Sequence, residues 1–306
     1  TGPSPRAEAT VDHAALAALQ SRTTAGGAAT YFEGMAEESA QRLALMAGLR
    51  DAVANDELEL HFQPIVDVRS GRVNAAEALL RWRAADGTHV PPSLFVPLAE
   101  ESGQIVAIGQ WVIEQAARAR RELDRRGFAE VAISVNVSAM QLSSGDIDAL
   151  MTRLIEATGV SPGGFHVEIT ETAMLKNHDA VRHALETLRA AGVHISIDDF
   201  GTGFSSMAYL RDLPLDCLKI DRSFVSGVDH EPKNASICAA LIALAHGLGL
   251  RVIAEGVEHR AEYEWLAAHG CDHVQGYFIA RPAPLDRLLA GLAADGRSAG
   301  AVQWRT

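Results

Sequence analysis

Eight apolar runs with strand character recur along the chain after its first fifty residues, and helical patterns separate most of them. The runs lie at 58–66, 73–82, 131–137, 165–170, 193–199, 217–221, 251–256 and 273–279. The helical patterns lie at 104–126, 147–158, 180–191, 234–248 and 261–269. Strands that alternate with helices form a parallel sheet. Eight such units in about 240 residues predict an α/β fold whose sheet closes into a (β/α)8 TIM-like barrel, rather than an open doubly wound sheet.

The connection between the first two runs differs from the others. Residues 67–72, with the sequence DVRSGR, are too few for a helix that crosses between parallel strands. A connection of this length suits a hairpin. We therefore expect the first strand to run antiparallel to the second.

The N-terminal segment differs in composition from the rest of the chain. Residues 1–30 are rich in Ala, Gly, Ser and Thr and contain a helical pattern at 12–19, and a second helical pattern follows at 32–53. The second pattern predicts a linker helix that leads into the barrel. We divide the chain into an N-terminal helical segment at 1–48, the barrel at 49–295 and a C-terminal tail at 296–306.

Charge and cysteine content exclude several classes of function. The formal net charge of −12 argues against binding of a DNA or RNA polymer, which depends on clustered Lys and Arg. The three cysteines have no CxxC spacing, which argues against a disulfide framework and favours a reducing compartment, so we expect the cytoplasm. No apolar run approaches the roughly 18 residues of a membrane span, and no signal-peptide pattern is present, so we expect no direct membrane contact by this chain.

Polar residues stand near the C-terminal ends of the predicted strands, where barrels of this type build their active sites. A single Glu or Asn in a strand has no special meaning, because it is usually solvated or caps a turn. A complete set is different, because buried polar groups without partners cost free energy and chance would scatter them along the strands. The set comprises Gln63, Glu77, Asn136, Glu168, Asp198, Asp199, Lys219, Asp221, Glu255 and Gln275.

The chemistry of this set favours a hard divalent cation. Carboxylate and amide oxygens are the ligands that Mg²⁺ or Mn²⁺ prefers, and the set contains no Cys or His that would favour zinc. The candidate ligands are Glu77, Asn136, Glu168 and Asp198.

Asp198 and Asp199 are adjacent like charges, and each raises the cost of ionising the other. Successive side chains of a strand point to opposite faces, so both carboxylates reach one site only if the strand ends there and the chain turns. Gly201 and Gly203 permit such a turn. A second cation beside Asp199 would bridge the two charges, and the alternative is an Asx-turn that follows a strand.

Lys219 allows two interpretations. Barrel aldolases use a lysine that forms a Schiff base, but this chemistry needs a lowered pKa, and surrounding carboxylates raise it. A charged Lys219 that holds a water or a phosphate oxygen fits the set better. An enolase-like barrel with Mg²⁺ and a lysine base is a further alternative, which would need a capping domain larger than the first fifty residues.

Short motifs follow one another at these strand ends. They are QPIVD at 63–67, EALLRW at 77–82, SVNVS at 134–138, EITET at 168–172, DDFGTGFSS at 198–206, LKID at 218–221, AEGVE at 254–258 and QGYFIARP at 275–282. Together they resemble the EAL-domain family of cyclic di-GMP phosphodiesterases, over about residues 49–292. The resemblance implies a (β/α)8 barrel with an antiparallel first strand, and hydrolysis of one phosphodiester bond of cyclic di-GMP to give linear pGpG.

The resemblance also implies a role for each matching residue. The first of two Mg²⁺ or Mn²⁺ ions would be held by Glu77, Asn136, Glu168 and Asp198, and the second by Asp198, Asp199 and Asp221. Glu255 is the candidate general base, and Lys219 flanks the attacking water with it. The candidate substrate-binding residues are Gln63, Leu80, Arg81 and Gln275, of which Gln275 also helps to hold the water or the second metal. The loop that follows Asp199 would be ordered by Glu171, Gly201, Thr202 and Gly203.

The resemblance extends to the partners. The segments VDHAAL, YFEGM and RLALMAGLR before the barrel resemble the last helix of a GGDEF domain and its connector, which implies an upstream GGDEF or sensory domain in a longer natural protein. An unrelated linker helix is the alternative. The family also implies cyclic di-GMP as ligand and a homodimer. A catalytically silent receptor for cyclic di-GMP or for a partner protein is the second functional interpretation, but such members usually lose metal ligands or the general base, and here all of these residues are present.

Overall fold

The computed structural model describes residues 35–144, 147–171, 178–201 and 207–295. The helix expected at 12–19, the loop residues Thr202 and Gly203 and the tail at 296–306 lie outside this part of the chain.

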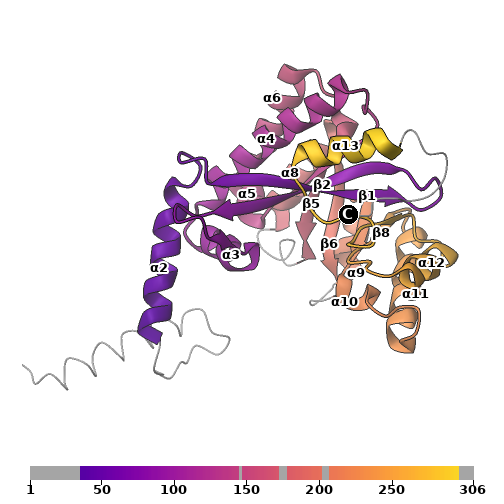
Figure 1. The fold of residues 1–306 in the computed structure, drawn as a ribbon. Helices are drawn as coiled ribbons and strands as arrows, with labels where there is room; N and C mark the ends of the chain where they lie inside the picture. The colour runs from indigo at the N-terminus through magenta and orange to yellow at the C-terminus, as the bar shows by residue number, and fades with distance from the viewer. Residues whose placement is uncertain (1–34, 145–146, 172–177, 202–206, 296–306) are drawn as a thin grey trace, which may run out of the picture.

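One sheet forms the centre of the described chain (Figure 1). Its strands lie in the order β1-β9-β8-β7-β6-β5-β4-β2-β3, and an additional pairing of β1 with β2 closes eight of them into a ring. The closed ring confirms the predicted barrel, and β3 is appended at the edge of β2. The strands are β1 (Leu58–Asp67), β2 (Val73–Arg83), β3 (His89–Val90), β4 (Ala132–Asn136), β5 (Phe165–Thr170), β6 (His194–Phe200), β7 (Cys217–Ile220), β8 (Arg251–Ala254) and β9 (His273–Val274).

The first strand runs against its neighbours, as the short connection predicts. β1 pairs antiparallel with β2, with Gln63 opposite Glu77, and antiparallel with β9, with Val66 opposite Val274. The pairs from β4 to β9 around the ring are all parallel. Because β1 is reversed, the middle of β1 delivers Gln63 to the rim at which the parallel strands end.

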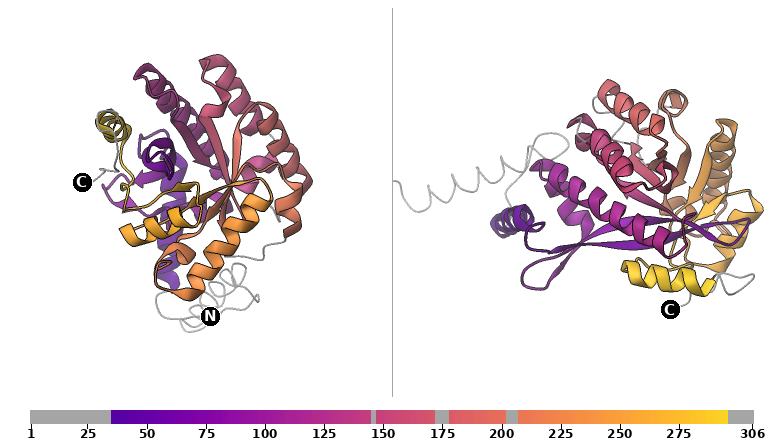
Figure 2. Two further views of the ribbon diagram at one scale, coloured as in Figure 1. Left: turned by 90° about the vertical axis from the view of Figure 1, so that its right-hand side faces the viewer. Right: turned by 90° about the horizontal axis from the view of Figure 1, so that it is seen from above.

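Helices cover the outside of the strands (Figure 2). They are α2 (Met35–Asp51), α3 (Pro92–Glu101), α4 (Ile105–Arg125), α5 (Ala139–Ser144), α6 (Ile147–Thr158), the 3-10 turn η1 (Pro162–Gly164), α8 (His178–Ala190), α9 (Met207–Asp212), α10 (Arg222–Val225), α11 (Pro232–Gly247), α12 (Arg260–Ala268) and α13 (Leu285–Asp295). The five helical patterns of the barrel sequence are confirmed, whereas α3, α5, α9, α10 and α13 are found only in the structure. Within the described residues, no helix combines the length and the apolar character that a membrane span needs.

The linker helix expected at 32–53 is present as α2, which extends away from the barrel and contacts α3 (Figure 1). Leu49 in its last turn and Ala52 just after it are fully buried, whereas Leu43 is 62 % exposed. The helix is therefore anchored to the barrel by its last turn.

Two strands end earlier than the sequence predicts. The run at 273–279 is a strand only over His273–Val274, because Gly276 brings its backbone against Val257, where a Cβ atom would lie 2.1 Å from the Val257 carbonyl oxygen. The run at 251–256 ends as a strand at Ala254, before Gly256, whose φ is +68°. Each strand thus ends just before a site residue, Glu255 or Gln275, at the rim of the barrel.

The barrel interior holds a small apolar cluster that is separate from the main core between strands and helices. Its buried members come from five strands: Ile65, Ala75, Ala132, Cys217 and Ile253. Strands such as β2 and β8 are not neighbours in the ring, so these side chains meet across the interior. The cluster divides the polar C-terminal rim from the N-terminal end of the barrel.

Candidate metal-binding and catalytic site

Lys219 on β7 is the centre of the C-terminal rim. Its side chain is fully buried, and its ammonium nitrogen contacts Glu168 and Glu255 directly. The same nitrogen lies 3.3 Å from Asp198 Oδ1 and 3.7 Å from Glu77 Oε2. The structure therefore brings together side chains from β2, β5, β6, β7 and the segment after β8, as the sequence predicts.

The electrostatics of this centre keep Lys219 charged. Burial acts to lower the pKa of Lys219, but the charges of Asp198, Glu168, Glu255 and Glu77 together raise it well above its usual value. A Schiff-base lysine needs the opposite shift, so that interpretation of Lys219 is wrong for this site. The charged ammonium instead offsets part of the repulsion among the carboxylates.

Two carboxyl groups in contact with Lys219, those of Glu168 and Glu255, have raised pKa values. Burial raises the pKa of Glu168 well above its ordinary value, with the charge of Glu77 adding to the effect against the opposing charge of Lys219. Burial likewise raises the pKa of Glu255 to about 8, and Lys219 opposes this shift while Asp198 adds to it. This surplus of negative charge is the electrostatic condition under which a divalent cation binds favourably.

Asp198 and Asp199 reach the same site by a different route from the one expected. β6 continues to Phe200 rather than ending at Asp199, but its register with β7 shifts between Ile197 and Phe200. Asp199 has a φ of +54°, in the left-handed region, so the backbone irregularity rather than the glycines turns its side chain toward the rim. Asp198, Asp199 and Glu255 each offer an oxygen within 4.8 Å of the others.

Amide side chains tie the first carboxylate into a network. Asn136 donates to Glu77 Oε1 at 2.7 Å, and Gln275 donates to Glu77 Oε2 at 2.6 Å. Gln275 also donates to Gln63 Oε1 at 3.0 Å, and Gln63 in turn donates to the Ala280 carbonyl at 3.0 Å. The four residues from β1, β2, β4 and the segment after β9 are therefore held in one arrangement, and the amide oxygens of Asn136 and Gln275 remain as acceptors.

Three other predicted residues lie around this centre. Leu80 and Arg81 lie further along β2, half-buried, and Arg81 donates to the Leu80 carbonyl at 2.9 Å. Asp221 caps α10 by accepting from the Ser223 backbone N–H at 2.9 Å, and its charge, after burial and Asp198, raises the pKa of Asp199. Asp221 is thus near Asp199, while its capping role gives it a structural use as well.

The predicted loop anchor is present. Glu171 is 5 % exposed, and its Oε2 accepts a hydrogen bond from the Gly201 backbone N–H at 3.3 Å. Contacts of Glu171 with Thr202 and Gly203 fall outside the described residues. The link joins the end of β5 to the end of β6, on either side of the candidate ligands.

Two residues that the sequence analysis did not single out support the site. Ser134, 1 % exposed, donates to Glu168 Oε1 at 2.5 Å from the same face of β4 as Asn136. Glu262, 2 % exposed on α12, accepts from the backbone N–H groups of Gly227, Glu258 and His259. Ser134 could have been found from sequence, because it lies two residues before Asn136 and therefore faces the same side of β4. Glu262 could not, because its contact with Gly227 joins segments that are far apart in sequence.

The donor set fits a hard divalent cation. The acidic side chains at the centre supply carboxylate oxygens, and Asn136 adds an amide oxygen. Among the described residues, the group of Asp198, Asp199 and Glu255 that could hold a metal contains neither Cys nor His. Oxygen donors of this kind suit Mg²⁺ or Mn²⁺.

Comparison with known proteins decides the family. A family model of the EAL domain matches residues 46–282. The chain belongs to the EAL domain family. The motif at 77–82 contains the Glu-Ala-Leu sequence of this chain, and its Glu77 accepts hydrogen bonds from Asn136 and Gln275.

Relatives of this EAL domain are longer signalling proteins. The bifunctional diguanylate cyclase/cyclic di-GMP phosphodiesterase MucR of Pseudomonas aeruginosa is 41% identical over 265 residues, which are 86% of this chain and 38% of MucR. The cyclic di-GMP phosphodiesterase NbdA of the same organism is 39% identical over 282 residues, which are 92% of this chain and 36% of NbdA. The chain therefore spans little more than a third of these relatives.

A solved structure shares the fold. The PaMucR phosphodiesterase in complex with c-di-GMP superposes with a TM-score of 0.76 and 40% identity, over 80% of this chain and 99% of that chain. The family expected from the motifs and the antiparallel-first-strand barrel are thus both confirmed.

Proposed function

We propose that this EAL domain is a metal-dependent phosphodiesterase that hydrolyses cyclic di-GMP to linear pGpG. The contact of Lys219 with carboxylates from four different segments in one buried centre carries the proposal. The names of MucR and NbdA and the ligand of the PaMucR structure support cyclic di-GMP as the substrate.

The chain would supply the ligands for two cations. We assign Glu77, Asn136, Glu168 and Asp198 to the first cation, and Asp198, Asp199 and Asp221 to the second. Bound Mg²⁺ or Mn²⁺ would supply Lewis-acid chemistry, which activates water and stabilises negative charge on phosphate oxygens. Burial is the main cause of the raised pKa values of Glu168 and Asp199, and repulsion by Glu77 and Asp198 adds to it, so a cation that relieves this repulsion would bind favourably here.

The proton chemistry falls to Glu255. Its carboxylate lies beside Lys219, and we assign it the role of general base that takes a proton from the attacking water. Lys219 keeps its charge and orients this carboxylate together with Glu168. The reaction adds one water across one phosphodiester bond of the cyclic substrate.

Substrate contacts would come from the other side of the rim. Gln63 and Gln275 hold each other through a hydrogen bond at the inner edge, and Gln275 also reaches Glu77. Arg81 offers a cation for a phosphate or for an acceptor edge of guanine, and Leu80 offers an apolar contact to a base.

The proposal also covers an upstream domain, the cellular compartment and the oligomeric state. MucR and NbdA are much longer than this chain, which supports an upstream GGDEF or sensory domain joined through α2. The three cysteines are free and buried, which supports the cytoplasm. We also propose a homodimer as the working form.

Incubation of the purified chain with cyclic di-GMP and Mg²⁺ or Mn²⁺ tests the function. The proposal expects pGpG to form and the cyclic substrate to disappear. Binding of cyclic di-GMP without any product would instead support the silent-receptor interpretation and contradict the proposed activity.

A further inference from the structure

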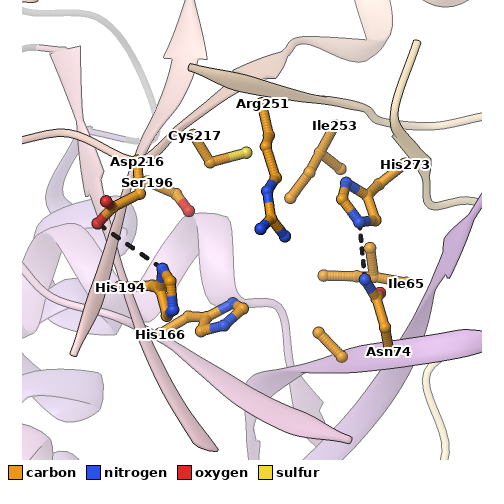
Figure 3. A pocket seen from close by; sticks show the side chains of 11 residues that line it. Ile65, Asn74, His166, His194, Ser196, Asp216, Cys217, Arg251, Ile253 and His273 are labelled. Atoms are coloured by element: carbon orange, nitrogen blue, oxygen red, sulfur yellow. Dashed lines mark hydrogen bonds and ion pairs between the residues drawn. The ribbon is translucent and has the colours of Figure 1, made fainter. Parts of the chain in front are cut away.

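The N-terminal end of the barrel contains a small cavity that is separate from the catalytic rim (Figure 3). Part of its wall comes from residues at the start of parallel strands: His166 of β5, His194 of β6, Cys217 of β7, Arg251 of β8 and His273 of β9. The candidate metal ligands Glu168 and Asp198 stand toward the opposite ends of β5 and β6. The two sites are thus at opposite ends of one barrel.

An apolar layer lies between the two sites. Ile65, Ala75, Cys217 and Ile253 line the cavity and also belong to the buried cluster of the barrel interior. A ligand in the cavity therefore rests on this layer and has no direct access to the carboxylates around Lys219.

The size of the cavity selects small ligands. Its volume is about 70 Å³, several times the ~10–15 Å³ that one water requires and far below the ~300–1,000 Å³ of pockets for drug-sized ligands. Arg251 and His194 are exposed residues, so the cavity opens to solvent. A ligand of a few heavy atoms can enter and fill it.

Arg251, the arginine that lines the cavity, lacks an acidic side-chain partner among the described residues. The guanidinium of Arg251 projects between His166 and His273 in Figure 3, and it has no ion pair within the described part of the chain. His273 is 7 % exposed, and its Nδ1 has no hydrogen-bond partner among the described residues. Asn74 donates to the other nitrogen of His273 at 2.7 Å, which orients the ring.

Three acids lie near the cavity, and each of them has other partners. Asp216 lines the cavity, where its Oδ2 lies 3.9 Å from His194 Nδ1, and it also accepts from the Ile195 backbone N–H at 2.9 Å and pairs with Arg189 at 3.4 Å. Asp272 accepts from the Val252 backbone N–H at 2.8 Å and from His246 at 2.9 Å. Asp67 accepts from the Ser70 backbone N–H at 2.7 Å and lies 3.9 Å from His273 Nε2.

Burial favours the neutral imidazoles of His166 and His273, so the permanent positive charge of the cavity is that of Arg251. Burial, followed by the positive charge of His194, His273 and Arg251, lowers the pKa of His166 to about 3. The rings of His166 and His194 meet edge to face, with centroids 5.1 Å apart. These imidazoles form no group of three metal-ligating atoms in the described chain, so a transition-metal site does not fit.

We propose that this cavity binds a small tetrahedral oxyanion, and that this anion is a phosphate group. Arg251 would donate paired hydrogen bonds to two oxygens, as guanidinium groups do with phosphate. His273 and His194 would donate to the remaining oxygens from opposite walls. The ligand is either free phosphate or the terminal phosphate of a phosphomonoester, whose remaining atoms would lie in solvent.

Thermal unfolding in the presence of Mg²⁺ tests the site, with phosphate and chloride compared at equal ionic strength. The chain is compared with Arg251→Gln and with Arg182→Gln, a matched control whose exposed arginine pairs with Glu186 on α8. Phosphate should raise Tm in wild type and in Arg182→Gln. In Arg251→Gln the Kd for phosphate should rise by at least about tenfold, because a charge-assisted bidentate contact is lost. Phosphate bound at the catalytic rim would contribute equally to all three proteins.

Equal phosphate effects in all three proteins, or none in wild type, would overturn the proposal. A parallel titration with 5′-GMP distinguishes the two sources of phosphate. An Arg251-dependent shift with 5′-GMP would support a phosphomonoester, and one seen only with inorganic phosphate would support the free anion. Because the readout is stability, the result is independent of whether cyclic di-GMP is hydrolysed.

Discussion

The carboxylate of Glu171 accepts a hydrogen bond from the backbone N–H of Gly201 at 3.3 Å, which joins the end of β5 to the end of β6. Glu168 lies three residues before Glu171, and Asp199 lies two residues before Gly201. The link therefore connects the segments that carry candidate ligands of both cations. We therefore expect the order of one segment to depend on the order of the other.

Glu171→Ala should weaken the apparent affinity for Mg²⁺ by about tenfold and lower kcat, because a hydrogen bond to a charged acceptor contributes roughly 1.5–3 kcal/mol. The fold should persist. Hydrolysis of cyclic di-GMP against Mg²⁺ concentration measures this effect, with Glu186→Ala on the exposed face of α8 as control. Superimposable curves for wild type and Glu171→Ala would show that Glu171 does not order the loop.

Removal of divalent cations should abolish hydrolysis and lower Tm. The carboxylates around Lys219 repel one another, and a ligand that binds only the folded state stabilises it. The chain is dialysed against EDTA, assayed, and assayed again after Mg²⁺ is restored. Hydrolysis that continues in excess EDTA would contradict the assignment of two cations.

Lys219→Met should destabilise the metal-free protein by about 3–5 kcal/mol, because removal of one partner from a buried ion pair leaves uncompensated charge. Urea unfolding in EDTA measures the free energy of unfolding. Lys233→Met, at an exposed position near the start of α11, is the matched control. A Lys219→Met protein as stable as the control would mean that Lys219 does not neutralise the carboxylates.

Glu262 positions the segment that carries the general base. Its carboxylate accepts from Glu258 N at 2.8 Å and His259 N at 2.9 Å, only a few residues after Glu255. Glu262→Ala should lower kcat more than it changes KM, and it should lower the free energy of unfolding by about 2 kcal/mol, because buried N–H groups lose their acceptor. Glu264→Ala, on the exposed face of the same helix, is the control. Loss of stability with an unchanged kcat would leave Glu262 a purely structural role.

The barrel could be predicted from sequence because its signals are local. Each strand is an apolar run, each main helix has its own periodicity, and the six residues 67–72 can only form a hairpin. α3 was missed because Pro92 and Pro97 obscure its helical pattern, although Pro92 stands in the first turn, where proline is tolerated.

Features that depend on distant contacts could not be predicted. The early end of β9 depends on Gly276 meeting the backbone of Val257, which precedes it by 19 residues. The turn of Asp199 depends on a register shift against β7. Likewise, the sequence does not show that the barrel places Arg251 and His273 beside His166 and His194.

Glu255 is the proposed general base of the hydrolysis, and the Glu255→Gln substitution tests this role separately from substrate binding. The substitution keeps size and hydrogen bonding but removes the base, so the rate of pGpG formation should fall by roughly 10²-fold or more. The measurement compares this rate with the Kd for cyclic di-GMP in the same preparations at saturating Mg²⁺. We expect a large loss of rate with a nearly unchanged Kd. A loss of affinity together with the loss of rate, or a rate equal to that of wild type, would contradict the role of Glu255 as general base.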